Sequence, residues 1–210
     1  MKKIMFNNTY GLTQAVKQGY KTMTRRVLNL SEEDEAWLDH TFDRDLCESD
    51  ILERYAQYKV DEIVAVAEPY KDIIGDRVFF VSYETGVSVH RSIMEREKGW
   101  SNKQNVASEF MPTRIRITGI KVEKLQDISG EDCLREGIAE KEGFWNTYSF
   151  DGSNKPKKLD RSGSIVLREI FLTPRNAFAA LIDKVSGKGT WNRNPYVAAY
   201  TFELVKGDQQ

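Results

Sequence analysis

The sequence predicts a small α+β barrel, and three observations lead to this fold class. Strand-like segments lie near both ends and in the middle of the chain, at residues 3–6, 114–124 and 196–205. Short helical segments separate them, as in α+β proteins. In the longest strand the alternation of apolar residues changes phase at Gly119, as at a β-bulge. Because a bulge bends a strand, and bent strands close barrels, we expect a barrel.

The N-terminal residues predict a strand followed by a helix. Residues 3–6 (KIMF) indicate the short strand, and a helix is expected over residues 10–18. Asn8 or Thr9 can cap its start, and Gly19 suits the left-handed position after its end. The chain then continues into a basic segment that carries several reactive residue types.

That basic segment, residues 22–28 (TMTRRVL), predicts a strand. In a regular strand, residues an odd number of positions apart face opposite sides, so Lys21 and Thr24 would diverge. The two side chains can point into one cleft only if Lys21 still lies in the turn after Gly19.

The next part of the chain alternates between inserted segments and strands. Residues 31–60 are charged and lack Gly and Pro, which indicates one or two amphipathic helices in an insertion. Residues 62–67 predict a short buried strand, and residues 75–84 a turn followed by a strand. Residues 86–109 are expected to be irregular, with Trp100 as their apolar anchor.

The C-terminal half carries clear boundary signals. Ser129 with Asp132 predicts a capped short helix that runs through Glu136 and is stopped by Gly137. Residues 139–164 are polar and indicate a surface loop.

A longer helix and a closing strand follow this loop. Thr173 caps a helix with Pro174 in its first turn, and Gly187 ends it. Residues 196–205 predict the closing strand.

Composition limits the classes of protein. The chain of 210 residues is 40% hydrophobic and 30% charged, which is typical of one large globular domain. No apolar run approaches a membrane span, and the start lacks the features of a leader, so the cytoplasm and no membrane partner are expected. Cys47 and Cys133, and His40 and His90, lack metal-binding or disulfide spacing, so we expect no metal and no cofactor.

Charge is close to balanced overall but unevenly placed. The formal net charge is −1, which argues against a long duplex DNA partner. Residues 21–26 and 114–124 are basic, and residues 31–35 (SEEDE) read as a solvated helix start. A small, local anionic ligand fits this distribution better than a polymer does.

Four ordered blocks resemble one known family. They are IMFNNTYGLTQAVKQGYKTMTRRV, EPYKDIIGDRVFFV, IKVEKLQDISGEDCLREGI and PRNAFAALIDKVSGKGTWNRNPYVAAYTFEL. Together they cover roughly half of the chain and are similar to the ASCH domain of the PUA-like superfamily, especially its larger phage and prophage-type members. The resemblance implies one PUA-like domain over residues 1–210, a pseudo-barrel of five or six strands with short flanking helices. The insertions would lie at about 31–60, 86–109 and 139–164.

The resemblance also implies function. ASCH proteins are associated with binding of RNA or modified nucleosides, and a small bacterial branch hydrolyses the acetyl amide of N-acetylated cytidine. That branch uses a lysine and a threonine of a G-x-K-T-x-T-x-R motif and a glutamate in a later helix. In this chain those positions match Lys21, Thr24 and Glu136, with Arg26 as the motif arginine. The chain departs from the phage-type pattern at VSYETG and at Met111-Pro112-Thr113.

Each catalytic candidate has a structural alternative. Lys21 is a base if burial and the neighbouring Arg25 and Arg26 lower its pKa, or else a surface lysine after a helix. Thr24 is the nucleophile or a substrate-binding hydroxyl if Lys21 takes its proton, or else simply a β-former. Glu136 would protonate the leaving amine with a raised pKa, or would lie on the surface at a helix end.

Further residues suit substrate binding. Arg25 and Arg26 can bind phosphate or carbonyl groups; because they alternate along a strand, only one is expected to line the cleft, and the resemblance favours Arg26. Trp191 and Asn194 could stack on a base and read its edge, or plug the fold and form a turn, which we favour for Trp191. Glu68 and Tyr70, at the end of a buried strand, could line the same cleft.

Three functions follow as hypotheses. The first, which the sequence favours, is a module that binds RNA or a nucleoside or nucleotide without chemistry. The second is an amidohydrolase acting on an N-acylated cytidine-type nucleoside through Lys21, Thr24 and Glu136. The third is a phage structural or regulatory protein with a vestigial pocket, whose insertions bind protein partners. Convergence of the three side chains in a pocket would favour the enzyme. The oligomeric state is left open.

Overall fold

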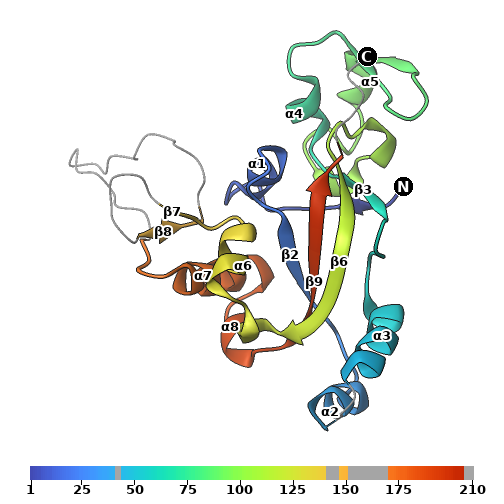
Figure 1. Ribbon diagram of the computed structural model, residues 1–210. Coiled ribbons are helices and arrows are strands. Elements are labelled where there is room, and N and C mark those ends of the chain that lie inside the picture. The colour runs from blue at the N-terminus through green and yellow to red at the C-terminus, as the bar shows by residue number, and fades with distance from the viewer. Residues whose placement is uncertain (41–43, 141–146, 151–169, 206–210) are drawn as a thin grey trace, which may run out of the picture.

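The computed structural model describes residues 1–40, 44–140, 147–150 and 170–205, leaving aside the side chains of residues 44–47. It shows a mixed α+β fold around a five-stranded sheet with the strand order β1-β3-β6-β9-β2 (Figure 1). The five strands are β1 (Lys3–Ile4), β2 (Met23–Val27), β3 (Ile63–Val66), β6 (Arg114–Lys124) and β9 (Tyr196–Leu204). The expected α+β class is confirmed.

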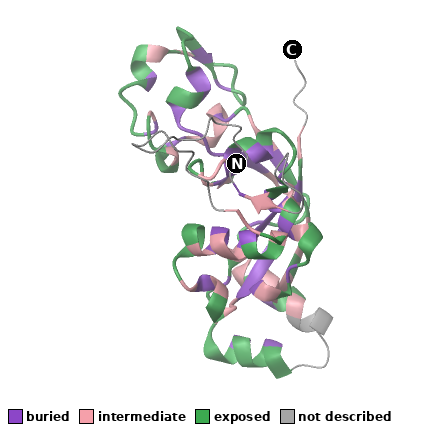
Figure 2. Cartoon of the chain, turned by 90° about the vertical axis from the view of Figure 1, so that its left-hand side faces the viewer, coloured by how far each residue is buried: buried purple, intermediate pink, exposed green. Residues whose placement is uncertain are grey.

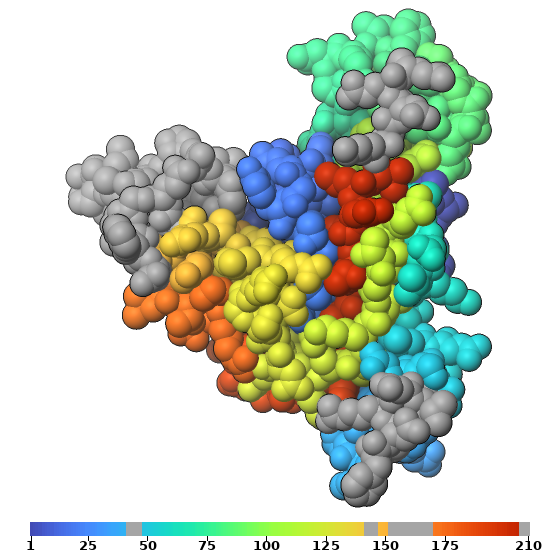
Figure 3. Space-filling model, in the orientation of Figure 1, coloured from blue at the N-terminus to red at the C-terminus, as the bar shows by residue number. Residues whose placement is uncertain are grey.

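Strand β9 lies between β6 and β2 in the sheet. It pairs antiparallel with β6 along one edge and with β2 along the other. β3 pairs antiparallel with β6, and β1 pairs parallel with β3. The space-filling view shows β9, in red, between the blue of β2 and the yellow-green of β6 (Figure 3).

The β-bulge expected at Gly119 is confirmed. The β6–β9 register shifts between Ile117 and Gly119, where Gly119 pairs with Thr201. A Cβ at Gly119 would lie 2.7 Å from Thr201 Oγ1, so any larger residue there would force the Thr201 side chain to move, which favours glycine.

The sheet nevertheless remains open. Strands β1 and β2 are the two ends of its order, and the described residues contain no closed barrel. A side chain, and not a pair of hydrogen-bonded strands, links these two edges. Arg26 Nη2, on β2, donates to the carbonyl of Met5, the residue after β1, at 2.7 Å. A bulge supplies curvature, but closure also needs strands long enough to meet, and β1 has only 2 residues.

Four helices cover the side of the sheet next to β2 (Figure 1). They are α1 (Leu12–Lys17), α6 (Gly130–Arg135), α7 (Pro174–Ser186) and α8 (Thr190–Arg193). The Ser129 and Thr173 side chains cap α6 and α7 as expected, accepting from the backbone N–H groups of Asp132 and Asn176. The cap expected at Asn8 or Thr9 is wrong, because Gly11 holds the N-cap of α1 with no side-chain cap.

The insertion at residues 31–60 forms two helices, α2 (Glu32–His40) and α3 (Arg44–Tyr55), within the expected range of one or two. Residues 32–35 form the first turn of α2, but Asp34 is buried and not solvated. It accepts a hydrogen bond from the Tyr55 hydroxyl at 2.5 Å and pairs with Arg54 at 2.8 Å. Asp34 therefore joins the two helices.

A second, smaller core lies at the far end of the sheet. It surrounds α4 (Tyr70–Ile74) and the hairpin of β4 (Phe79–Val81) and β5 (Ser88–His90), which α5 (Arg91–Met94) follows. Trp100 packs partly buried against this core, as expected of an anchor. Two 3₁₀ turns, Lys103–Asn105 and Ser108–Phe110, complete the region. Residues 86–109 were expected to be irregular, which is wrong for β5 and α5 within them, and helices α4 and α8 were not predicted either.

The main core lies between the sheet and its covering helices, whereas α2 is largely exposed (Figure 2). Another 3₁₀ turn, Leu125–Asp127, links β6 to α6. The hairpin of β7 (Ala139–Glu140) and β8 (Tyr148–Ser149) belongs to the segment expected as a surface loop, and most of that segment lies outside the described residues. None of the described helices has the length and apolar character needed to cross a membrane.

Candidate functional site

A cavity of ≈310 Å³ lies between β2 and α7 and gathers the central predicted residues. Lys21, Thr24, Arg25, Arg26 and Glu136 all line it. Its opposite wall is apolar and comes from α7, through Phe178, Leu181, Ile182 and Val185. This volume falls at the lower end of the range for small-molecule sites.

Lys21 and Glu136 form a buried pair in this cavity. Lys21 Nζ donates to Glu136 Oε2 at 2.6 Å and to the Glu136 carbonyl at 2.7 Å. The side chains are only 2% and 5% exposed. Both are therefore withdrawn from water, and neither lies on the surface. The ammonium group of a lysine has three N–H donors, so one donor is left for a ligand or a neighbouring hydroxyl.

Local backbone structure brings the pair together. Lys21 lies in the turn before β2, as its convergence with Thr24 requires, and Glu136 lies at the C-cap of α6. The Thr22 backbone N–H donates to the carbonyl of Arg135 at 2.9 Å, which ties this turn to the end of α6. Gly137 has φ 99°, and a Cβ at this position would lie 3.6 Å from the Lys21 side chain. The left-handed conformation there favours glycine and turns the chain away behind Glu136.

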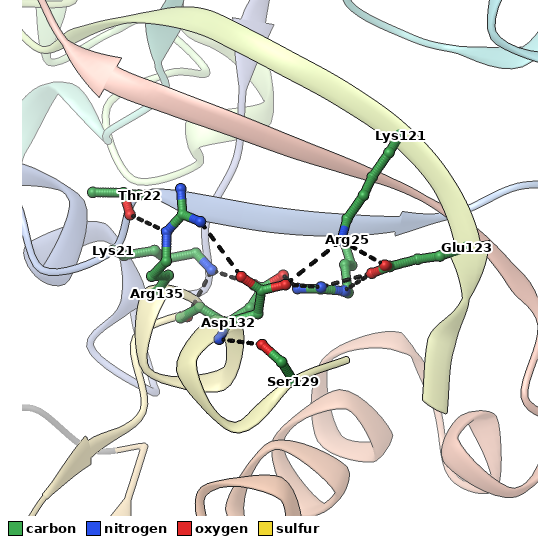
Figure 4. A network of polar contacts seen from close by, with 9 residues as sticks. Lys21, Thr22, Arg25, Lys121, Glu123, Ser129, Asp132 and Arg135 are labelled. Atoms are coloured by element: carbon green, nitrogen blue, oxygen red, sulfur yellow. Dashed lines mark hydrogen bonds and ion pairs between the residues drawn. The ribbon is translucent and has the colours of Figure 1, made fainter. Parts of the chain in front are cut away.

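Arg25 organises the carboxylates behind the pair (Figure 4). Its buried guanidinium donates to Glu136 Oε1 at 3.2 Å, Asp132 Oδ2 at 3.0 Å and Glu123 Oε1 at 2.7 Å. Lys121 pairs with Glu123 at 2.8 Å on the outer side of the same network. Glu136 thus receives Lys21 on one oxygen and Arg25 on the other, which fixes the plane of its carboxylate.

Burial and charge shift the ionisation of both cations. Burial lowers the pKa of Lys21; the Glu136 carboxylate opposes that shift, and Arg26 and Arg25 reinforce it. Burial alone would also lower the pKa of Arg25, but Glu136, Glu123 and Asp132 outweigh it and raise that pKa. Arg25 therefore stays charged, while Lys21 loses its proton more readily than a surface lysine.

Thr24 and Phe6 complete the interior of the cavity. Thr24 is 5% exposed, and within the described residues its hydroxyl makes no hydrogen bond. The Phe6 ring lies 5.6 Å from Lys21 Nζ and 5.8 Å from the Arg26 guanidinium, so one aromatic ring contacts both cations. Phe6 was not singled out from the sequence, where it reads only as part of an apolar strand.

The expectation that only one of Arg25 and Arg26 lines the cleft is wrong. Arg26 faces the cavity beside Thr24, two residues away on β2. Arg25 also contributes to the lining, because its long side chain reaches Glu136 at the cavity wall.

Glu68 and Tyr70 lie away from this cavity, contrary to expectation. Glu68 is buried but accepts from Lys17 Nζ at 2.9 Å and from the Thr113 hydroxyl at 3.3 Å. The Tyr70 hydroxyl accepts from the Ala107 backbone N–H at 2.7 Å within the second core. Glu68 therefore joins the second core region to α1, whereas Tyr70 is held within the second core.

Trp191 and Asn194 also lie outside the cavity lining. Trp191 packs against Phe178 and under the Arg175 guanidinium. Asn194 has φ 48°, and its side chain accepts from the Gln126 backbone N–H at 2.7 Å. These contacts match the alternative interpretation, in which Trp191 plugs the fold and Asn194 forms a turn. From the same short helix, Thr190 and Arg193 line the cavity instead.

Searches for a metal site and for related proteins add no further assignment. Across the described part of the chain, no group of three or more His, Cys, Asp or Glu side chains is arranged to hold a metal ion. Comparison with family models, with curated proteins and with solved structures found no match to this chain.

Proposed function

We propose that this protein is an amidohydrolase of the ASCH type, which binds an N-acylated cytidine-type nucleoside in the cavity and hydrolyses its acyl amide. The observation that carries this proposal is the buried Lys21–Glu136 pair, which lines one cavity together with Thr24. The motif resemblance supplies the substrate class. In this proposal the open sheet is a variant of the PUA-like barrel.

The cavity offers the groups that the reaction needs. Thr24 Oγ attacks the acyl carbonyl and gives its proton to neutral Lys21. The C–N bond then breaks, Glu136 delivers a proton to the leaving amine, and the acyl group remains as a threonine ester. Glu136, now ionised, takes a proton from water as the water attacks the ester, and Lys21 returns its proton to the departing Thr24 oxygen. The net reaction consumes one amide and one water and yields the free nucleoside and a carboxylic acid, which ionises to the carboxylate and a proton.

Proton transfer within the pair prepares this chemistry. A charged lysine beside a carboxylate and a neutral lysine beside a carboxylic acid differ only in the position of one proton. Burial disfavours the charged arrangement, which is the main cause of the lowered pKa of Lys21. The neutral arrangement contains a base next to an acid, as acyl transfer requires.

A second candidate function is binding without chemistry, which the sequence alone favours. Arg25 donates to the same Glu136 carboxylate that Lys21 contacts, so this carboxylate has two cationic partners. A permanently charged Lys21 is a hydrogen-bond donor for a base or a carbonyl and cannot accept the proton of Thr24. RNA or a nucleoside would then be held and released unchanged.

Turnover of N-acetylcytidine by the purified protein separates these candidates. We expect release of acetate and cytidine, followed by chromatography, and a loss of about 10²–10⁴-fold in kcat for Thr24→Val, which keeps the shape of the side chain without its hydroxyl. Thr118→Val, on the exposed face of β6, is the matched control and should retain wild-type turnover.

One outcome contradicts the enzyme, and another contradicts only its proposed nucleophile. Saturable binding of the nucleoside with no turnover would assign the binding function. Turnover that survives in the Thr24→Val variant would exclude the threonine as nucleophile and leave water activated by Lys21 as the attacking group.

The third hypothesis, a protein-binding role, corresponds to a different surface. Apolar side chains are exposed on the β4–β5 hairpin and on α5, including Phe79, Val87 and Ile93 at 58%, 59% and 54%. This surface does not touch the cavity, so a partner there and chemistry in the cavity are compatible.

A further inference from the structure

We propose that the ligand of the cavity is a nucleotide and not a free nucleoside, and that Arg26 and Arg193 bind its phosphate. This inference rests on the proposed nucleoside-binding function and names the substrate class of the same site. Its basis is the distribution of paired and unpaired positive charge around the cavity.

Charges in the deep part of the cavity are balanced. Lys21 and Arg25 both contact Glu136, and Arg25 has Glu123 and Asp132 as further partners. These groups satisfy one another and leave little attraction for an external anion. The deep end is therefore suited to the neutral acyl amide of the proposed reaction.

Arg26 and Arg193 differ from that cluster. Both line the cavity. Arg26 forms no ion pair with a carboxylate of the described residues, whereas Arg193 lies near enough to the Asp183 carboxylate to interact with its charge without forming a close ion pair. Arg26 Nη2 is engaged by the Met5 carbonyl, whereas its Nε is buried and has no hydrogen-bond partner in the described structure. A buried donor without a partner is costly, and the Arg26 side chain lines the cavity, where an anion can contact its guanidinium.

Arg193 provides a second cation at the mouth of the cavity. It lies on α8, where its Nη2 donates to the Thr190 hydroxyl at 3.0 Å, and the residue is exposed. Arginine binds phosphate through parallel N–H donors, and charge-assisted bonds of this kind are stronger than neutral ones. A guanidinium anchored on its own helix is suited to a phosphate that remains partly in water.

The positions of Thr24 and Arg26 give a nucleotide a direction in the cavity. Thr24 and Arg26 are two positions apart on one strand, which places their Cα atoms about 7 Å apart on the same face. In a cytidine nucleotide, the acylated amine and the 5′-phosphate lie at opposite ends of the molecule. With the acyl group at Thr24, the phosphate points toward Arg26 and the mouth. The apolar wall of α7 faces the base.

Calorimetric titration of the full chain with cytidine and with cytidine 5′-monophosphate tests this inference. Neither probe carries an acyl group, so the readout does not depend on catalysis. We expect the monophosphate to bind about tenfold or more tightly than cytidine, with an affinity that falls as salt is added. The variants Arg26→Gln and Arg193→Gln should lose this advantage and keep their affinity for cytidine.

The controls separate phosphate binding from folding. Arg96→Gln removes an exposed arginine beyond α5 and should leave both affinities unchanged. Because Arg193 is exposed, its variant should fold even if loss of the Arg26–Met5 contact destabilises the chain. Arg26→Lys keeps the charge and should retain part of the advantage.

The outcomes distinguish the two proposals. Equal affinity for cytidine and its monophosphate would overturn the phosphate site and leave the nucleoside function in place. No binding of either compound would overturn both. A dinucleotide with only an internal phosphodiester extends the test: affinity equal to that of the monophosphate, lost in Arg193→Gln, would support the site and identify RNA as the source of the phosphate.

Discussion

Two buried glutamates, Glu136 and Glu68, have similar partners and different surroundings. Each accepts from a lysine, Lys21 for Glu136 at 2.6 Å and Lys17 for Glu68 at 2.9 Å. The Lys17 side chain is 37% exposed, whereas that of Lys21 is 2% exposed. Water therefore solvates one partner of the Glu68 pair and neither partner of the Glu136 pair. Only the Lys21–Glu136 pair lines the cavity.

The difference indicates what each pair contributes. A half-exposed pair joins two parts of a fold at little cost, which suits Glu68 at the junction with the second core. A fully buried pair recovers its desolvation penalty poorly, so such a pair is weak evidence for stability. Together with a cavity and a threonine, it supports a chemical role for Glu136 and Lys21.

The largest expected effect comes from replacing Lys21, and the same replacement of Lys17 serves as its comparison. Lys21→Met should lower turnover by about 10²–10⁴-fold. It should also lower the free energy of unfolding by about 3 kcal/mol, because it breaks a buried pair whose glutamate keeps only Arg25. Lys17→Met should cost less than about 1 kcal/mol and retain turnover. Urea denaturation and the chromatographic assay measure both. Equal losses in the free energy of unfolding for Lys21→Met and Lys17→Met would contradict the distinction between the two pairs.

A smaller effect is expected from neutralising the two glutamates. Glu136→Gln keeps the shape of the side chain and an oxygen for Lys21, so the fold should persist, while kcat falls about 10²-fold for want of a proton donor. Glu68→Gln should leave kcat unchanged, because Glu68 lies outside the cavity. If Glu68→Gln slows the reaction as much as Glu136→Gln does, the assignment of one chemical and one structural glutamate is wrong.

The smallest effect is a pH dependence of stability. Burial lowers the pKa of Lys21, so between that lowered value and the ordinary lysine value near 10.4 the unfolded chain binds more protons than the folded one. Lys21 therefore contributes a rise of the free energy of unfolding with pH across this window, whereas burial raises the pKa of Cys133 and contributes a fall above the ordinary value of that thiol. Urea denaturation at a series of pH values measures the slope, which Lys21→Met should reduce.

Lys103 supplies the control for this measurement. Burial also lowers the pKa of Lys103, so it contributes a slope of the same sign. Lys103→Met should remove only its own share. An unchanged slope in Lys21→Met would show that Lys21 titrates at its ordinary value and would weaken its role as a base.

Local signals in the sequence predicted much of this fold. Ser129 and Thr173 indicate helix starts through short-range hydrogen bonds, and Gly119 marks the bulge because a side chain there would crowd Thr201. The turn after Gly19 places Lys21 beside Thr24, and this depends on a few neighbouring residues alone. Such features need no knowledge of distant partners.

Features that depend on distant partners were missed. Thr190 and Arg193 are three residues apart and share the face of α8 that lines the cavity, whereas Trp191 and Asn194 share another face. Without the helix, the aromatic and the amide looked like the better ligands. Glu68 follows a buried strand, but the sequence does not say that Lys17 and Thr113 lie on its side.

The position of β9 has a consequence for the folding kinetics. Among the described strands, β9 is the only ladder partner of β2, and nearly the whole chain separates the two. Contacts between such distant segments carry a large loop-closure entropy and form slowly. The residues at the N-terminal side of the cavity therefore have no ladder support until β9 arrives. During synthesis, the cavity can assemble only after residues 196–204 have left the ribosome, however early Lys21 and Thr24 emerge.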